Sequence, residues 1–194
     1  MKKAVFLLTT IFTLAIAANA QGLAVGTTIE DFSLPMAGKG NITSLKEQKG
    51  KNGAVVMFLS AQCPVVKGYI ERINAVADDY KARGITFIGI NSNATESPEW
   101  VASDASQNFR FPMLIDKGNK LADKLGATVT PEAYYIDAKN VLVYHGAIDN
   151  DRSGESITDT YLRTAFDQSL AGQKVTNTRK NAFGCSIKKA AAEK

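Results

Sequence analysis

The strongest constraint on the fold is an apolar strand that runs directly into a helix and is followed by a second strand. Residues 54–60, AVVMFLS, are continuously apolar, as is typical of a strand buried on both faces. From Pro64 the apolar residues recur every three to four positions, which predicts a helix that ends at Gly84. These apolar residues are Val66, Ile70, Ile73, Ala77 and Tyr80. Residues 85–92, ITFIGINS, then form another buried strand, so this β-α-β unit predicts parallel strands in an α/β fold.

The remaining elements continue this alternation and then add a hairpin. We expect a small strand at 32–35, a helix from Pro98 to about Gln107, a strand over 111–116, a helix over 120–126, two strands within 132–146 and a helix over 158–172. The polar residues 137–140 form the turn between the two hairpin strands. The order β-α-β followed by β-β-α predicts one α/β domain with a central mixed β-sheet flanked by helices, and this order resembles the thioredoxin-like layout. A helix-bearing insertion occupies roughly 97–126 between the two halves.

The N-terminus has the three parts of a secretory signal peptide. Met1-Lys2-Lys3 is basic, residues 4–17 are apolar or hydroxylic without charge, and Ala18-Asn19-Ala20 matches an A-x-A cleavage site. The apolar run is shorter than the ~20 residues that a membrane span needs. We therefore expect cleavage near Ala20 and a periplasmic or secreted protein without a stable membrane anchor. The alternative is an N-terminal helix that stays attached.

These boundaries divide the chain into a signal peptide (1–20), a domain (21–172) and a C-terminal tail (173–194) that carries Cys185. The net charge of +4 falls by two when the lysines of the signal peptide are removed, and the other basic residues are scattered. This pattern does not favour nucleic acid as a partner. The chain has two cysteines and one histidine, His145, so neither a zinc site nor a Cys–His catalytic pair is expected. We expect no metal and no cofactor, and we interpret His145 as structural.

Cys63 stands where the first buried strand turns into the helix. Pro64 suits the first helical position, because it has no N–H to leave unpaired, and this places Cys63 at or next to the N-cap. The free N–H groups and the dipole of a helix N-terminus favour a thiolate, and such sites lower a thiol pKa from ~8.5 to roughly 3.5–7.5. Cys63 is thus a candidate nucleophile; the alternative is a small buried hydrophobic residue.

Thr130 and Pro131 stand directly before the hydrophobic strand that begins the hairpin. A cis bond before proline carries only a small penalty, and it would turn the backbone of Thr130 towards the thiol. There the backbone would pair with an extended peptide or shield the sulfur. An ordinary trans proline at the start of a strand is the alternative.

These motifs together resemble the thioredoxin-like superfamily, in its redoxin branch of alkyl hydroperoxide reductase and thiol-specific antioxidant (peroxiredoxin-like) proteins. The resemblance covers about residues 25–172 and rests on AVVMFLSAQCPVVKGYI, GITFIGINSN, FPMLIDKGNKLADKLGATVTPEAYYID and VLVYHGAIDN, and the chain also ends in the GCSIK motif of some redoxins. Ser60 matches the Thr or Ser that peroxiredoxins carry three residues before their cysteine. Val66 replaces the second cysteine of C-x-x-C, and Val56 replaces the proline seven residues before the cysteine. Arg72 and Arg152 are candidates for the arginine of the family.

The resemblance implies an exported antioxidant oxidoreductase in which Cys63 attacks a hydroperoxide and Cys185 is the candidate resolving thiol. An external dithiol reductant would reset the pair, and Ser60, Pro64, Thr130 and Pro131 would support the active site. Two alternatives remain open. One is a thiol–disulfide oxidoreductase that acts on disulfides of exported proteins. The other is a non-catalytic module, either stapled by a structural Cys63–Cys185 disulfide or holding unpaired thiols.

Overall fold

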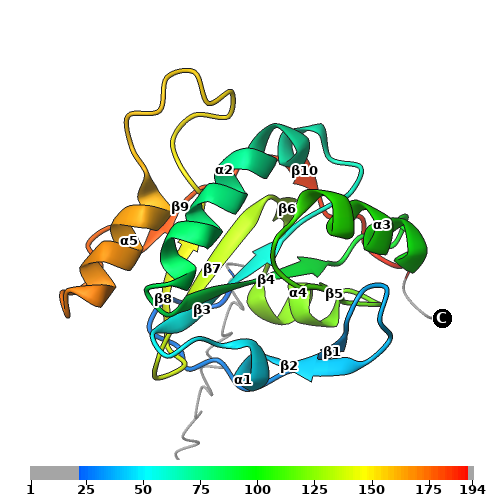
Figure 1. The fold of residues 1–194 in the computed structure, drawn as a ribbon, viewed down its shortest axis with the longest axis horizontal. Coiled ribbons are helices and arrows are strands. Elements are labelled where there is room, and N and C mark those ends of the chain that lie inside the picture. The colour runs from blue at the N-terminus through cyan, green and yellow to red at the C-terminus, as the bar shows by residue number, and fades with distance from the viewer. Residues whose placement is uncertain (1–21, 192–194) are drawn as a thin grey trace, which may run out of the picture.

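A mixed β-sheet forms the centre of the molecule, with helices on both of its faces (Figure 1). The structure, a computed structural model, describes residues 22–191, so the predicted signal peptide (1–20) lies outside the described part. The helices are α1 (Leu45–Gln48), α2 (Pro64–Lys81), α3 (Pro98–Asn108), α4 (Lys120–Leu125) and α5 (Tyr161–Leu170). The strands are β1 (Ser33–Pro35), β2 (Ile42–Ser44), β3 (Gly53–Phe58), β4 (Ile85–Asn91), β5 (Met113–Ile115), β6 (Val129–Thr130), β7 (Glu132–Asp137), β8 (Leu142–Gly146), β9 (Arg179–Lys180) and β10 (Cys185–Ser186).

The sheet contains both parallel and antiparallel pairs, as the sequence predicts. β7 pairs antiparallel with β3 and with β8, whereas β4 and β5 pair in parallel. β3 lies beside β4, where the Leu59 N–H donates to the Ile90 carbonyl at 2.9 Å. The fold class is therefore confirmed: it is α/β with a central mixed sheet. Within residues 22–191, no helix combines the length and the hydrophobicity needed to cross a bilayer.

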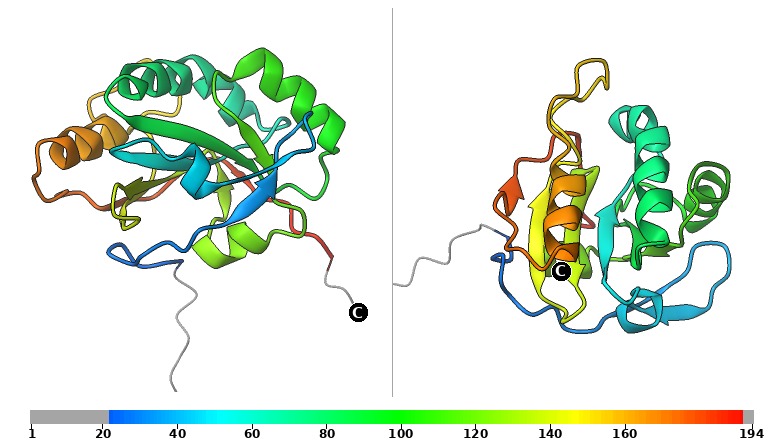
Figure 2. Two further views of the ribbon diagram at one scale, coloured as in Figure 1. Left: turned by 60° about the horizontal axis from the view of Figure 1, so that its bottom comes forward. Right: turned by 60° about the vertical axis from the view of Figure 1, so that its left-hand side comes forward.

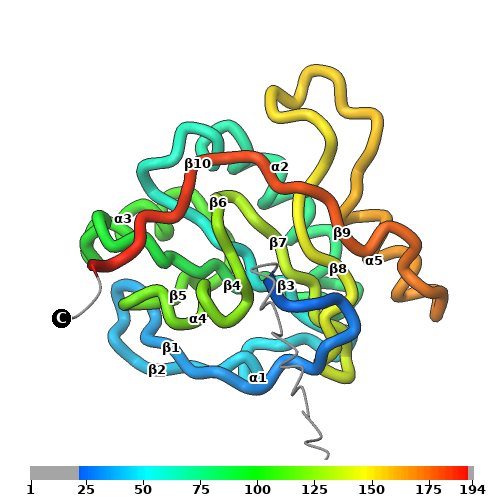
Figure 3. The backbone as a smooth tube through the Cα atoms, turned by 180° about the vertical axis from the view of Figure 1, so that it is seen from behind, coloured from blue at the N-terminus to red at the C-terminus, as the bar shows by residue number. Residues whose placement is uncertain are grey.

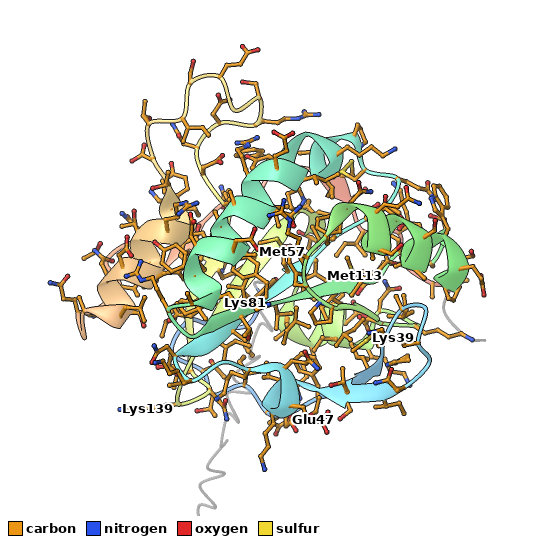
Figure 4. All side chains as sticks on the ribbon, viewed as in Figure 1. Lys39, Glu47, Met57, Lys81, Met113 and Lys139 are labelled. Carbon is orange, nitrogen blue, oxygen red and sulfur yellow. A yellow bond between two sulfur atoms is a disulfide. The ribbon has the colours of Figure 1, made fainter. Side chains whose placement is uncertain are left out.

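Alternate side chains of the central strands build two apolar layers, one on each face of the sheet. β3 is buried along its whole length. Val55 and Met57 pack in the layer with residues of α2, α3 and α5, whereas Ala54, Val56 and Phe58 pack in the layer with residues of α1 and α4. The ribbon views of Figure 2 show helices on both faces of the sheet. Figure 4 shows Met57 within the interior, while Lys139 at the β7–β8 turn extends into solvent.

Helix α2 covers the first of these layers and fixes the position of Cys63 at its start. Its buried side includes four of the five residues predicted from the periodicity, namely Val66, Ile73, Ala77 and Tyr80. Ile70 is only partly buried, because the centre of the buried side lies nearer to Tyr69 and Val76.

This difference in burial gives a matched prediction on one helix. Ile73→Val should lower the free energy of unfolding by about 1 kcal/mol, because Ile73 is fully buried and loses a methylene within a packed core. Ile70→Val, with the same chemistry and the same helix propensity, should cost less than half as much. Urea denaturation of both variants measures the difference. Equal losses would show that the two positions are packed alike.

The C-terminal tail crosses the back of the molecule instead of projecting from it (Figure 3). After α5 the chain forms β9, which pairs in parallel with β8, and then β10, which pairs antiparallel with β6. Sequence analysis predicts no strands here, because the segment is polar and each strand is only two residues long. At Gly146 (φ 136°), a Cβ atom would lie 1.7 Å from the Lys180 carbonyl oxygen, so glycine permits the close approach of β9.

Candidate active site

Cys63 occupies the N-cap of α2, as the sequence predicts, with extended backbone angles of φ −75° and ψ 115°. Pro64 takes the first helical position, and the Cys63 carbonyl accepts the Lys67 N–H at 3.1 Å. A helix N-terminus favours negative charge, so this position would stabilise a thiolate on Cys63 once the protein is reduced. Cys63 is nevertheless only 2% exposed.

Cys63 and Cys185 form a disulfide, although they are 122 positions apart in sequence. Their Cα atoms lie 5.9 Å apart. Cys185 belongs to β10 and stands opposite Thr130 in the antiparallel β10–β6 pair. The tail therefore folds back across the domain to bring its cysteine to the start of α2.

The Thr130–Pro131 peptide bond is cis and lies against this disulfide. The Thr130 carbonyl oxygen is 3.3 Å from Cys63 Sγ, and Thr130 is 1% exposed. In the reduced protein this carbonyl is placed to accept a hydrogen bond from the Cys63 thiol. The structure thus brings together Cys63, Pro64, Thr130, Pro131 and Cys185.

The Ser60 hydroxyl is directed to a different partner. It donates to Glu96 at 2.5 Å, and the same carboxylate accepts the Ala61 N–H at 2.9 Å and the Asn91 side-chain amide at 2.7 Å. The Cys63 N–H donates to the Ser60 carbonyl at 3.4 Å, so Glu96 holds the turn that leads into the cysteine. Sequence reasoning missed Glu96, because an acidic residue in a polar loop gives no sign that its carboxylate is buried.

A second buried carboxylate, Glu132, orders the other side of the site. One of its oxygens accepts the Thr128 N–H at 2.9 Å and the Val129 N–H at 3.3 Å, while the other lies 2.6 Å from His145 Nε2. His145 also stacks on the Tyr134 ring, with 4.1 Å between centroids. Its contacts agree with the structural role expected for it. Sequence reasoning missed Glu132, although an acidic residue at the start of a buried strand is unusual enough to be a signal.

Removing the Glu132 carboxylate should destabilise the fold. Glu132→Ala leaves two backbone N–H groups and the His145 ring without their acceptor in a buried region, which should lower the free energy of unfolding by about 3 kcal/mol. Glu132→Gln keeps an oxygen acceptor and should lose about half as much or less. Urea denaturation of the two variants tests this, and an alanine variant as stable as the glutamine variant would contradict it.

Arg72 makes its contacts in a neighbouring loop. It pairs with Asp149 at 2.7 Å, donates to the Asp151 and Arg152 carbonyls at 2.8 and 3.0 Å, and lies over the Tyr69 ring.

Within residues 22–191, no three or more His, Cys, Asp or Glu side chains are arranged to hold a metal ion. A cavity of about 590 Å³ lies elsewhere, between the β7–β8 turn and the chain that follows α5.

Comparisons with known proteins identify the family of this arrangement. Residues 25–145 match the AhpC/TSA family. A crystal structure of a hypothetical protein from Sinorhizobium meliloti 1021 is 35% identical, with a TM-score of 0.80, and the match covers 88% of this chain and 97% of that one. The thiol-disulfide oxidoreductase ResA of Bacillus anthracis is 27% identical over 106 residues, which are 54% of this chain and 60% of that relative.

A more distant structure shares the fold. Peroxidoxin BcpB from Mycobacterium tuberculosis is 19% identical, with a TM-score of 0.55, and the match covers 76% of this chain and 94% of that one. The layered architecture, the cysteine at the start of α2 and the family match lead to the same conclusion. The chain belongs to the AhpC/TSA family and has the thioredoxin-like fold.

Proposed function

We propose that this protein is a thiol-dependent redox enzyme in which Cys63 and Cys185 alternate between a dithiol and a disulfide. The observation that carries the proposal is their pairing at the N-terminus of an 18-residue helix, beside the Thr130 carbonyl. An external dithiol would open the disulfide and release the Cys63 sulfur as a thiolate, which the helix N-terminus stabilises. When the Cys63 and Cys185 thiols pass two electrons to a substrate, the disulfide between them forms again.

Thiol–disulfide exchange is the reaction that we favour. The named activity of the ResA relatives supports it, although the matched segment spans 60% of the first of them. The chemistry needs only an activated sulfur and a neighbouring thiol, and both are present in this arrangement. The substrate would be a disulfide, and the reductant would be an external dithiol.

Hydroperoxide reduction is the second candidate, supported by the family match and by Ser60 three residues before Cys63. The Cys63 thiolate would attack one peroxide oxygen, releasing an alcohol and forming a sulfenic acid. The Cys185 thiol would then displace water and form the disulfide. This route needs a hydroperoxide to reach the Cys63 sulfur, which is buried in the disulfide form. The Ser60 hydroxyl bonds to Glu96 and the Arg72 guanidinium pairs with Asp149, so neither group is directed to a peroxide in this structure.

We place this chemistry outside the cytoplasm. The basic, apolar and small-residue segments of residues 1–20 support export, and an oxidising compartment allows a disulfide to persist. N-terminal sequencing of protein recovered from the periplasm or the medium tests this proposal. An intact Met1 on that protein would count against cleavage.

One experiment separates the three functional possibilities. Reduced protein is exposed to a stoichiometric amount of either a small disulfide or a hydroperoxide, alkylated, and mapped by non-reducing peptide mass spectrometry. If the protein catalyses thiol–disulfide exchange, the added small disulfide should rapidly link Cys63 to Cys185. If it is a peroxidase, the added hydroperoxide should rapidly form the same link. If neither oxidant links the two cysteines faster than it links cysteines in an unfolded control, the pair is a structural staple.

A further inference from the structure

The backbone edge beside Cys63 is occupied by the chain itself. β10 pairs antiparallel with β6 and places Cys185 opposite Thr130. The contact is close: a Cβ atom on Gly184 would lie 1.9 Å from the Thr130 carbonyl oxygen. An extended peptide from another protein would need this same backbone of β6 to add as a strand. In this chain the C-terminal segment already takes that place.

The segment is held there by contacts other than the disulfide. Ile187 is buried, and its N–H donates to the Thr128 carbonyl at 2.9 Å. The Lys188 N–H donates to Asn93 Oδ1 at 2.9 Å, and the Lys188 carbonyl accepts the Ala94 N–H at 2.9 Å. These bonds lie on the C-terminal side of Cys185, so cleavage of the disulfide removes none of them.

The segment is also anchored on the N-terminal side of Cys185. The Phe183 ring packs against Tyr69 of α2, with 6.4 Å between centroids. Segment 183–188 is therefore anchored on both sides of Cys185 by contacts that do not include the disulfide. The two cysteines also differ in exposure: Cys63 is 2% exposed, whereas Cys185 is partly exposed.

From these contacts we propose that the C-terminal segment 183–188 permanently occupies the β6 edge, so that the enzyme exchanges with low-molecular-weight disulfides that enter at Cys185, and not with extended polypeptides. The inference rests on the redox function proposed above and specifies its substrate class. A small disulfide needs no strand pairing and reaches the partly exposed sulfur directly.

The exchange balances in two steps. The Cys185 thiolate attacks one sulfur of R–S–S–R, forming Cys185–S–S–R and releasing R–S⁻. The Cys63 thiolate then attacks the Cys185 sulfur, forming the Cys63–Cys185 disulfide and releasing a second R–S⁻. Two electrons pass from the protein dithiol to the small disulfide, and the two thiol protons pass to the released thiolates.

The test compares two probes that carry the same chromogenic leaving group. In one, 2-nitro-5-thiobenzoate is disulfide-bonded to free cysteine; in the other, it is bonded to the central cysteine of an unstructured peptide. Reduced wild type should release the chromophore from the cysteine probe about tenfold faster, because the segment obstructs the β6 edge on which the backbone of the peptide probe would have to lie. Gly184→Ala displaces the segment from Thr130 and should speed chromophore release from the peptide probe. The ratio of the cysteine-probe rate to the peptide-probe rate should therefore fall.

Gly68→Ala is the matched control, because a Cβ at that position meets no atom within 4 Å. It should keep the wild-type ratio. In the Cys63→Ser variant the cysteine adduct should accumulate on Cys185, whereas Cys185→Ser should react slowly. Equal rates for the two probes in wild type, or an adduct found first on Cys63, would overturn the inference and leave the redox function standing. No reaction with either probe would overturn both.

A second measurement does not depend on any variant. Amide hydrogen exchange of reduced wild type should show the Ile187 N–H protected to a similar degree as in the oxidised protein, because its bond to Thr128 does not depend on the disulfide. Loss of protection at Ile187 on reduction would show that the segment leaves the β6 edge, and the inference would then be wrong.

Discussion

Replacing Cys63 with serine is expected to abolish turnover with any disulfide or hydroperoxide substrate, with a fall on the order of a hundredfold or more. The physical reason is that a serine hydroxyl is neither ionised at the helix N-terminus nor able to form a bond to sulfur that can be exchanged. Steady-state consumption of the substrate with a dithiol reductant measures the effect.

Cys185→Ser provides the comparison, because it removes the second sulfur and leaves α2 and Cys63 in place. It should also lose turnover, since the Cys63–Cys185 disulfide can no longer form. Circular dichroism should show both variants folded in reducing buffer. Turnover at the wild-type level in either variant would show that the pair is not the redox centre.

Reduction of the Cys63–Cys185 disulfide is expected to lower the free energy of unfolding by about 4–5 kcal/mol. The bond closes a loop with a sequence separation of 122, and in the chain-entropy model a loop of about 100 residues contributes about 4.7 kcal/mol by restricting the unfolded chain. Urea denaturation of the oxidised and the reduced protein measures this difference.

The double variant Cys63→Ser/Cys185→Ser serves as the control for the reductant. It should resemble the reduced wild type and should not respond to dithiol. A difference below about 1 kcal/mol between oxidised and reduced wild type would mean that the unfolded chain is already restricted without the bond.

The order of the main elements could be predicted from the sequence because each carries a local signal. The apolar run at 54–60, the helical period from Pro64 and the strand at 85–92 appear as β3, α2 and β4, with end points shifted by a few residues. Alternation of strands and helices then limits the sheet to few topologies. The position of Cys63 at the start of a helix follows from this helical period together with Pro64, which suits the first helical position.

The short strands of the tail could not be predicted in the same way. β9 and β10 are two residues each, and their sequences have no strand preference of their own. They form because β8 and β6 present unpaired backbone groups that the tail satisfies. Pairing of this kind depends on which edges the rest of the fold leaves open, so no local pattern encodes it.

The candidate site shows the same division between local and tertiary information. Pro131 allows either isomer, and the structure has the cis bond, with the Thr130 carbonyl against Cys63. Ser60 matches a family position by its spacing, yet its hydroxyl bonds to Glu96, which lies 36 residues away. Contacts of this kind require segments that the folded sheet brings together.

By itself, the sequence determined the α/β class, the helix-start position of Cys63 and the presence of a second cysteine in a polar tail, because propensity, periodicity and proline chemistry act over a few neighbouring residues. Only the tertiary structure decided that Cys185 lies opposite Thr130, that Glu96 and Glu132 are buried on either side of the cysteines, and that the tail covers β6. These features depend on burial and on backbone pairing between distant segments, which exist only once the sheet and its two helical layers have assembled.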